Sequence, residues 1–440
     1  MPPRILIIGG GFTGLTAAYR LSREPGWEIT LAEAADHLGG LAAGFPFLGT
    51  SLEKAYHHLF LTDTSILQLV DELGLNDRLI WCESSVGIYR GGRIYPFMSP
   101  ADLLRYQPCS FAGRLRLGAA ALYLKHKKNW RGLAAQPAHD WMTAWCGRSA
   151  MESVWTPLLK GKFDRYYDTI SMAWLWARIH LRAHSRGPGG REKLGYFRGG
   201  FAEVVRRLES EIIRHGVKIR RGARVEGFSG LERSARIDGQ PERFDACIFT
   251  GPSPAFAQLL PVDRALEAYA RQLQSIEYLG AICLVFASEQ NLGDYYWINV
   301  NEPDAPFLVF LNHTRLVSPS HYQGKYVYYL GAYRPLDSPS FALSDDGLAQ
   351  GWWAYLKKMF PEFNPSRVCE RHVFRFKAAQ HIADTGYERK IPGYRTPLPG
   401  VFLSNFSQVF PEDRGTNFAV REGLKIADKV REEMRAGLMG

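Results

Sequence analysis

Three glycines near the start of the chain, Gly9, Gly11 and Gly14, are spaced as G-x-G-x-x-G. In this spacing the first glycine can make a tight turn, the second lets a pyrophosphate approach the backbone, and the third lets a helix lie close to a strand. The backbone N–H groups of Phe12 and Thr13 at the helix start then face the phosphates. The motif predicts a dinucleotide-binding turn, and a glycine-rich turn without a ligand is the plainer alternative.

Glu33 is the acidic residue that such a turn requires about twenty residues further on. It ends residues 28–33, which have the composition of a strand. A carboxylate at this place can accept hydrogen bonds from the hydroxyl groups of a ribose. Taken alone, Glu33 could also be a solvated strand end.

These residues need a strand, a helix and a second strand to hold them in place. The β-branched run 4–8 predicts the first strand, residues 15–21 the helix and residues 28–33 the second strand. This order is a βαβ unit, in which phosphates lie at the helix N-terminus.

A second glycine turn, Gly39 and Gly40, follows the acidic residue, and Leu41 comes directly after it. With the first motif, this pattern resembles that of the superfamily of flavin amine oxidases, protoporphyrinogen oxidases and phytoene desaturases. The resemblance implies FAD as the cofactor, bound without a covalent linkage. Many members have an arginine after the two glycines, so Leu41 departs from the family at one expected phosphate contact.

Two further stretches extend the resemblance over nearly the whole chain. Residues 155–163, followed by Ser171, are similar to the PL-x-x-G-x-F…S stretch of protoporphyrinogen oxidase-like proteins. After residue 195 the family's order returns the chain to the FAD domain, where the backbone of Val225 would meet the adenine. One more α/β crossover, with Val225 merely buried, is the alternative.

The C-terminal stretch completes the implied cofactor site. Residues 400–405 predict an apolar strand, and the resemblance places Asn405 where relatives carry an Asp that touches the ribityl and phosphate region. Thr416 and Asn417 lead into a predicted helix over 418–433, whose N-terminus would aim its positive end at the flavin pyrimidine ring. A C-terminal helix with Thr416 or Asn417 as its N-cap is the alternative.

The predicted fold class is α/β, with a Rossmann-like FAD-binding domain of the GR2 flavoprotein type and an inserted α+β substrate domain. A chain of 440 residues has room for both. We expect the FAD-binding domain in residues 1–85, 195–255 and 390–440. The substrate-binding domain would take residues 86–194 and 256–389.

Catalytic candidates are few, because flavin chemistry needs little from side chains. His57 and His58 lie where family members run past the reactive side of the flavin, and they could orient substrate or move a proton. Satisfied structural histidines are the alternative. Amine oxidases of the superfamily often place a lysine on the strand that matches residues 279–286, which has none here, and this argues against simple amine oxidation.

Lys162 is the third catalytic candidate and belongs, with Lys160 and Arg178, to a basic group among aromatic residues. Such a group could hold a phosphate, diphosphate or carboxylate against an apolar wall. A solvated basic face is the alternative. A strand-like run further along the chain carries four tyrosines, Tyr326, Tyr328, Tyr329 and Tyr333. One face of this run could line a substrate channel, and core packing is the alternative.

The net charge of +10, from 54 Lys and Arg against 44 Asp and Glu, suits an anionic partner. No nucleic-acid-binding motif accompanies it, so no nucleic acid is expected. The six cysteines form no C-x-x-C pair, so neither a disulfide framework nor a metal site is expected, and a cytoplasmic location fits best.

Residues 111–131 combine an apolar helix over 111–124 with a cluster of cations and Trp130. This segment could rest on an acidic bilayer, at the inner face of the membrane. A buried helix followed by a solvated basic turn is the alternative.

The function predicted from these features is an FAD-dependent oxidase, dehydrogenase or desaturase that removes hydride from a bulky, apolar or lipid-linked substrate. One rival is a redox-neutral flavoenzyme that resembles UDP-galactopyranose mutase, which shares the His-x-Gly-Gly turn seen at residues 37–40 and acts on a sugar diphosphate. Another is a nucleotide-binding protein without catalysis. The oligomeric state stays open.

Overall fold

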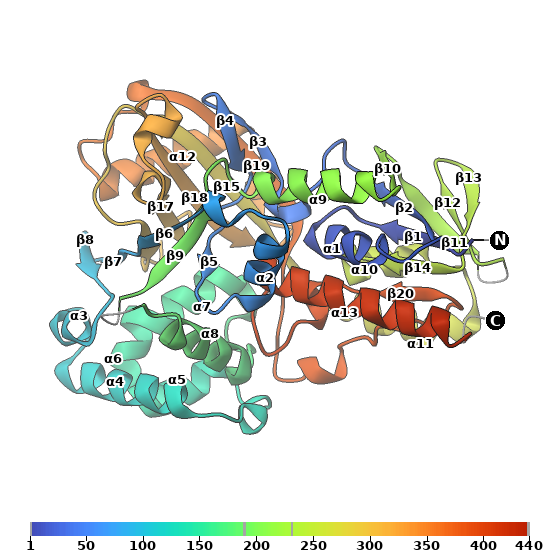
Figure 1. Ribbon diagram of the computed structural model, residues 1–440. Helices are drawn as coiled ribbons and strands as arrows, with labels where there is room; N and C mark the ends of the chain where they lie inside the picture. Colours follow the sequence, from blue (N-terminus) through green and yellow to red (C-terminus); the bar gives the residue numbers. More distant parts are fainter. Residues whose placement is uncertain (1, 188–190, 230–231, 438–440) are drawn as a thin grey trace.

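The computed structural model describes residues 2–187, 191–229 and 232–437. A five-stranded parallel sheet forms the end of the molecule at which both chain termini lie (Figure 1). Its strands come from three separate stretches of the chain. Their order across the sheet is β10 (Lys218–Arg221), β2 (Glu28–Glu33), β1 (Arg4–Ile8), β14 (Ala246–Phe249) and β20 (Val401–Leu403).

Both faces of this sheet are covered, which explains the continuous apolar run in β1. Ile5 and Ile7 belong to the core that includes the helices on one face, while Leu6 and Ile8 belong to a separate core on the other face. The first face carries α1 (Phe12–Leu21), α2 (Thr64–Glu72), α9 (Ala202–Arg214) and α13 (Thr416–Arg435). The second carries β11 (Val225–Ser229), β12 (Ser234–Ile237), β13 (Gln240–Arg243), α10 (Ser253–Leu259) and α11 (Glu267–Gln274).

A seven-stranded mixed sheet lies at the other end of the molecule (Figure 1). Only β16 and β7 pair in parallel, and one face packs on α12 (Asp345–Met359). Its order is β19 (Val368–His381), β15 (Tyr278–Ser288), β18 (Tyr326–Arg334), β17 (Val309–Asn312), β16 (Trp297–Val300), β7 (Val86–Arg90) and β8 (Arg93–Pro96).

A helical layer stands below this sheet in Figure 1, and α7 packs against β18. The layer consists of α3 (Pro100–Arg105), α4 (Phe111–His126), α5 (Ala138–Cys146), α6 (Arg148–Ala150), a π-helical turn (Met151–Trp155), α7 (Thr156–Phe163) and α8 (Met172–His184). Two small sheets are also present. One pairs β3 (Gly44–Phe47) with β4 (Thr50–Glu53), and in the other β9 (Lys193–Phe197) lies between β5 (Leu59–Phe60) and β6 (Leu79–Glu83). In the described part of the chain, none of the helices combines the length and apolar content needed to cross a membrane.

The predicted elements are present, with small shifts at their ends. The first helix begins at Phe12 rather than residue 15, and the C-terminal helix covers Thr416–Arg435 rather than 418–433. The parallel strands fall within the three segments predicted for the FAD domain, and the seven-stranded sheet falls within the two predicted for the substrate domain. The domain boundaries themselves stay a prediction.

Candidate functional site

The turn between β1 and α1 depends on two glycines. Gly9 has a φ of 107°, and its N–H donates to the carbonyl of Ala32 at 2.8 Å, which joins the turn to β2. A Cβ atom on Gly14 would overlap the carbonyl oxygen of Gly9. Only glycine at position 14 therefore lets α1 begin so close to the strand. Gly11 is the N-cap of α1, and the first turn of that helix carries no acidic side chain.

The second glycine turn lies directly against the first. Gly39 donates its N–H to the carbonyl of Gly10 at 2.8 Å, and Gly11 and Gly39 pair as an isolated β-bridge. Both Gly39 and Gly40 have positive φ, and a Cβ atom on Gly40 would come within 3.1 Å of the Cα of Gly11. The two turns thus form one continuous backbone surface, here called the glycine cradle (residues 9–14 and 39–40).

Glu33 holds the cradle from the end of β2. Its carboxylate accepts a hydrogen bond from Gly10 N at 2.6 Å and another from Ala35 N at 2.8 Å. The side chain of Phe12 is buried and packs on the ring of Phe201, so only its backbone remains available to a ligand. Thr13 is buried as well. The predicted contact of Glu33 with a ribose stays a prediction.

Three independent features of the cradle fit a bound dinucleotide. The helix N-terminus is free of side-chain caps and of acidic residues, the backbone is bare at Gly11, and a carboxylate stands at the end of β2. Ala223 N also bonds to the carbonyl of Glu33 at 2.9 Å, which brings the start of β11 at Val225 near the same strand end. Val225 is half-buried there, and its contact with adenine stays a prediction.

The side chain of Asn405 is committed to protein groups. Its Nδ2 donates to Gly251 O at 2.8 Å and to Ser253 Oγ at 3.2 Å, and its Oδ1 accepts from the N–H and hydroxyl of Ser407. These four bonds use the whole hydrogen-bonding capacity of an amide. The backbone N–H of Asn405 also donates to Gln408 Oε1 at 2.8 Å, so a contact between Asn405 and a cofactor would have to come from its carbonyl oxygen.

The start of α13 differs from the capped-helix alternative. Gly415, not Thr416 or Asn417, is the N-cap, and no side chain caps it. The Oδ1 atom of Asn417 instead accepts from the N–H groups of Ser65 and Ile66, at 2.9 and 3.2 Å, and so caps α2. Thr416 and Asn417 both line a large cavity, so this helix N-terminus faces open space.

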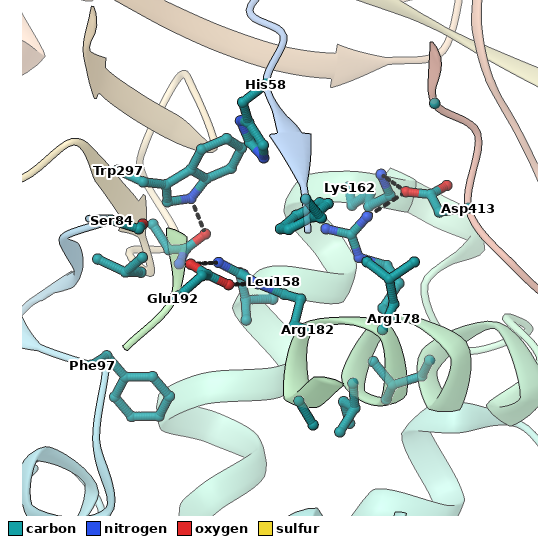
Figure 2. A pocket seen from close by; sticks show the side chains of 18 of the residues that line it. His58, Ser84, Phe97, Leu158, Lys162, Arg178, Arg182, Glu192, Trp297 and Asp413 are labelled. Atoms are coloured by element: carbon teal, nitrogen blue, oxygen red, sulfur yellow. Dashed lines mark hydrogen bonds and ion pairs between the residues drawn. The ribbon is translucent and has the colours of Figure 1, made fainter. Parts of the chain in front are cut away.

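The cavity has a volume of about 1610 Å³ and lies where the helical layer, the seven-stranded sheet and the start of α13 meet. Leu41, next to the glycine cradle, lines it, and so do His57 and His58. Its walls are mostly apolar, with contributions from Phe97, Leu103, Leu117, Leu158, Leu175, Ile179 and Trp297. Figure 2 shows charged side chains meeting at two places along this wall.

The first charged cluster is centred on Asp413, which is 8% exposed. Lys162 Nζ lies 3.0 Å and Arg178 Nη1 2.6 Å from its Oδ2 atom (Figure 2). Trp174 and Gln380 donate to the other carboxylate oxygen, each at 3.2 Å. Burial alone would raise the pKa of Asp413, but the nearby Lys162, Arg178 and Arg414 hold that pKa far below its usual range. Asp413 is therefore ionised near pH 7.

The predicted basic group is divided by the structure. Lys162 and Arg178 meet at the cavity, whereas Lys160 is exposed and lies over the ring of Tyr167 at 4.8 Å. Of the four tyrosines on β18, only Tyr333 is among the cavity-lining residues of the described chain. Tyr328 packs in the core on the α12 face. The alternation left a channel face and core packing open, and the structure places Tyr333 at the cavity and Tyr328 in the core.

The second charged cluster is the ion pair of Arg182 and Glu192, with two bonds of 3.0 Å (Figure 2). His58 lies close by, with its Nδ1 atom 3.0 Å from the hydroxyl of Tyr296. Burial lowers the pKa of His57 to about 4 and that of His58 to about 3, so both rings are neutral near pH 7. Nδ1 of His57 lies 2.7 Å from the carbonyl of Ala55 and must carry the proton, which leaves Nε2 as an acceptor.

The sequence did not reveal Asp413, Arg414 or Tyr56 as parts of this site. Arg414 donates to the hydroxyl of Tyr333 at 2.7 Å, and Tyr56 and Arg414 both line the cavity. The only available signal was the position of residues 413–414 just before the C-terminal helix. Over the described ranges, no group of three or more His, Cys, Asp or Glu side chains is arranged to hold a metal ion.

Comparison with known proteins places the chain among flavoproteins. A family model described as flavin containing amine oxidoreductase matches residues 12–430. A coproporphyrinogen III oxidase of Staphylococcus aureus is 22% identical over 301 residues, a match that covers 61% of this chain and 65% of the length of that enzyme.

Solved structures share the fold at low sequence identity. The structure of a candidate protoporphyrinogen oxidase from Exiguobacterium sp. 255-15 matches with a TM-score of 0.78 at 19% identity, over 98% of this chain and 99% of the other. A reduced UDP-galactopyranose mutase matches with a TM-score of 0.77 at 15% identity, over 98% and 96%. The resemblance and fold class predicted from the sequence are confirmed.

Proposed function

Because the chain belongs to the flavin-containing amine oxidoreductase family, we propose that it binds FAD non-covalently and oxidises a bulky, apolar or lipid-linked organic substrate. The observation that carries the proposal is the position of Leu41, which follows the glycine cradle and also lines the large cavity. A dinucleotide held on the cradle can therefore extend into the cavity, where Thr416 begins α13. When bound, the flavin supplies a hydride acceptor.

The residues of the chain position both the cofactor and the substrate. The N–H groups at the start of α1 bind phosphates, and the N-terminus of α13 presents positive potential at the far end of the cofactor. Neutral His57 offers Nε2 as a hydrogen-bond acceptor to the substrate. The apolar wall excludes water, and the cations Lys162 and Arg178 attract an anionic group. The substrate we propose is thus an amphiphile with an apolar body and a carboxylate or phosphate.

The experiment follows the absorbance of the purified protein during anaerobic mixing with a panel of amphiphilic anions, including polyprenyl phosphates and tetrapyrrole carboxylates. A substrate bleaches the flavin band. The spectrum staying unchanged with every member, while dithionite bleaches it, would exclude this substrate class. Heat denaturation tests the linkage, because non-covalent FAD is released into the supernatant and covalent flavin remains with the pellet.

A second candidate function is a redox-neutral rearrangement of a sugar diphosphate. In the first charged cluster, three cations, Lys162, Arg178 and Arg414, stand beside the single carboxylate of Asp413. This excess of positive charge favours a diphosphate ligand, and so does the fold shared with UDP-galactopyranose mutase. Product analysis separates the two functions. An oxidase or dehydrogenase consumes an electron acceptor in proportion to its product, whereas the rearrangement consumes none.

We also propose a peripheral membrane contact through residues 111–131. Helix α4 exposes Phe111, Leu115 and Leu122, at 62%, 51% and 59%, beside cations such as Arg116 and Lys128. Leu122 and Lys125 also line the cavity, so an amphiphile could pass from a bilayer into the site.

Vesicle flotation tests the membrane contact. The protein is expected to float with vesicles that contain anionic phospholipid, and the Leu115→Glu/Leu122→Glu variant is expected to stay in the dense fraction. Equal flotation of both proteins would contradict the proposed contact. An Ile213→Glu variant, at an exposed apolar position on α9, is the matched control.

A further inference from the structure

Two tyrosines from distant parts of the chain meet in the cavity beside the first charged cluster. Tyr333 is near the end of β18 and is 8% exposed, and Tyr56 precedes the histidine pair. A Cβ atom on Gly331 would come 2.7 Å from the Tyr56 ring, so glycine there lets Tyr56 lie close to β18. Gly331 and Tyr333 are two residues apart on a strand and so face the same side.

The hydroxyl oxygen of Tyr333 is an acceptor for two donors. Arg414 Nη2 donates to it at 2.7 Å, and the hydroxyl of Tyr56 forms a further hydrogen bond with it. Two donors on one phenol oxygen favour its ionised form, because each bond strengthens when the oxygen becomes negative. The proton of Tyr333 itself is then free to leave.

Cations surround the same ring. Lys162 Nζ lies 5.0 Å from the centre of the Tyr333 ring and Arg414 Cζ 5.6 Å from it. The nearest anion is Asp413, which is already paired with Lys162 and Arg178. Cys283 on β15, Tyr56 and His57 also line the cavity, and His381 on β19 is within electrostatic range of Arg414 and Lys162. Burial raises the pKa of Cys283 and of Tyr56, and it lowers the pKa of His57 and of His381 to about 4.

Arg414 has unused capacity toward the cavity. Within the described residues its Nε atom is buried and has no hydrogen-bond partner. A buried guanidinium N–H without a partner is costly, so a ligand acceptor is expected to reach this point. Arg414 would then bridge the ligand and Tyr333.

We infer that Tyr333 is the group that receives the substrate proton, as a tyrosinate held between Arg414, Lys162 and Tyr56. This inference rests on the proposed oxidation and names a catalytic residue for it. In this oxidation the C–H bond of the substrate would break, and a bound flavin would supply the acceptor for the hydrogen and its electron pair. The adjacent N–H, O–H or C–H bond gives its electron pair to the new double bond and its proton to the phenolate oxygen of Tyr333.

The electrostatics agree with this role. Burial raises the pKa of Tyr333, but Arg414 and then Lys162 outweigh it, so the pKa lies below that of an ordinary tyrosine. Tyr56 shows the reverse, since burial raises its pKa well above the usual value. Only Tyr333 of the pair is set up to ionise.

The first test is a titration of tyrosinate absorbance on the purified holoprotein. Wild-type protein is expected to show an early step below the main tyrosine titration, and Tyr333→Phe is expected to lose it. Tyr326→Phe, on the same strand, should retain the step, and Arg414→Gln and Lys162→Met should shift it to higher pH. The early step persisting in Tyr333→Phe, or staying in place in both cation variants, would overturn the inference.

The second test measures the rate of flavin reduction against pH with a substrate found in the anaerobic screen. The rate should rise with pH through the early step, and Tyr333→Phe should lower it about 100-fold and abolish the rise, as expected for loss of a general base. A rising limb that survives in Tyr333→Phe contradicts the inference. Failure of the whole panel to reduce the flavin would count against the proposed oxidation, whereas the titration alone still decides whether Tyr333 ionises.

Discussion

The glycine cradle and the first charged cluster are built in opposite ways. The cluster is here called the cavity floor and consists of Lys162, Arg178, Tyr333, Gln380, Asp413 and Arg414. The cradle presents the backbone of residues 9–14 and 39–40, and its shape depends on the absence of side chains at its glycines. The floor is side chain, assembled from α7, α8, β18, β19 and the loop before α13. An added atom at Gly14 of the cradle therefore overlaps backbone, whereas the floor depends on a balance of charges.

The largest effect is expected from Gly14→Ala in the cradle. The new Cβ overlaps the carbonyl oxygen of Gly9, so the turn or α1 must move. We expect a loss of stability of about 4 kcal/mol and no bound flavin. Thermal melting and the flavin-to-protein absorbance ratio measure both. Gly351→Ala in α12, where a Cβ meets nothing within 4 Å, should instead be neutral or slightly stabilising.

Asp413→Asn tests the floor by removing the carboxylate that pairs with Lys162 and Arg178. Lys162 and Arg178 lose their partner, and we expect a loss of about 3 kcal/mol, at the low end for a broken buried pair because Arg178 is 37% exposed. Flavin content should stay near that of the wild type. The matched control is Asp337→Asn, whose solvent-exposed pair with Arg165 should contribute little to stability. Equal effects of the two substitutions in chemical denaturation would refute the charge-balance account.

Glu53, at the end of β4, is a buried carboxyl that predicts a pH dependence. Its carboxylate accepts from Tyr196 Oη and Phe201 N, and Tyr329 donates to its carbonyl. Burial raises the pKa of Glu53 from 4.5 to about 7. A raised folded pKa favours folding at low pH, so this contribution is complete below pH 4.5 and is lost as pH rises through 7. The difference is on the order of 3 kcal/mol.

Denaturation of wild type and Glu53→Gln between pH 4.5 and 8 measures this contribution. The wild type should lose stability relative to the variant as the pH rises. A constant difference over this range would be incompatible with a buried, titrating Glu53. Glu28→Gln, at the exposed start of β2, controls for surface charge.

The smallest effect is expected at Asn417, which lies at the start of α13 and lines the cavity. Asn417→Ala removes the cap of α2 and should cost about 1 kcal/mol, with flavin content unchanged. Thr416→Ala, one residue earlier and without that cap, should cost less in the same melting experiment. A larger loss in Thr416→Ala would restore the alternative in which Thr416 caps α13.

The cradle was predictable from sequence because its parts are neighbours along the chain. Spacing alone placed Gly9, Gly14 and Glu33, and the structure adds only the contact between the two turns. The floor was not predictable, because Asp413 lies 251 positions from Lys162 and 235 from Arg178. No local pattern encodes such a pair.

Periodicity explains the errors in the predicted basic group. Lys160 and Lys162 are two residues apart on α7, which is about 200° around a helix, so they cannot share a face. Trp174 and Arg178 are four apart on α8 and do share one, toward Asp413. On β18 the alternation gave two faces but could not tell which one meets the cavity.

The most direct test of the account is the flavin content of the purified protein, together with the uptake of added FAD by protein stripped of flavin. We predict a yellow protein that releases equimolar FAD on heating and, once stripped, binds it again. A colourless protein that takes up no added FAD would contradict the assignment of the glycine cradle.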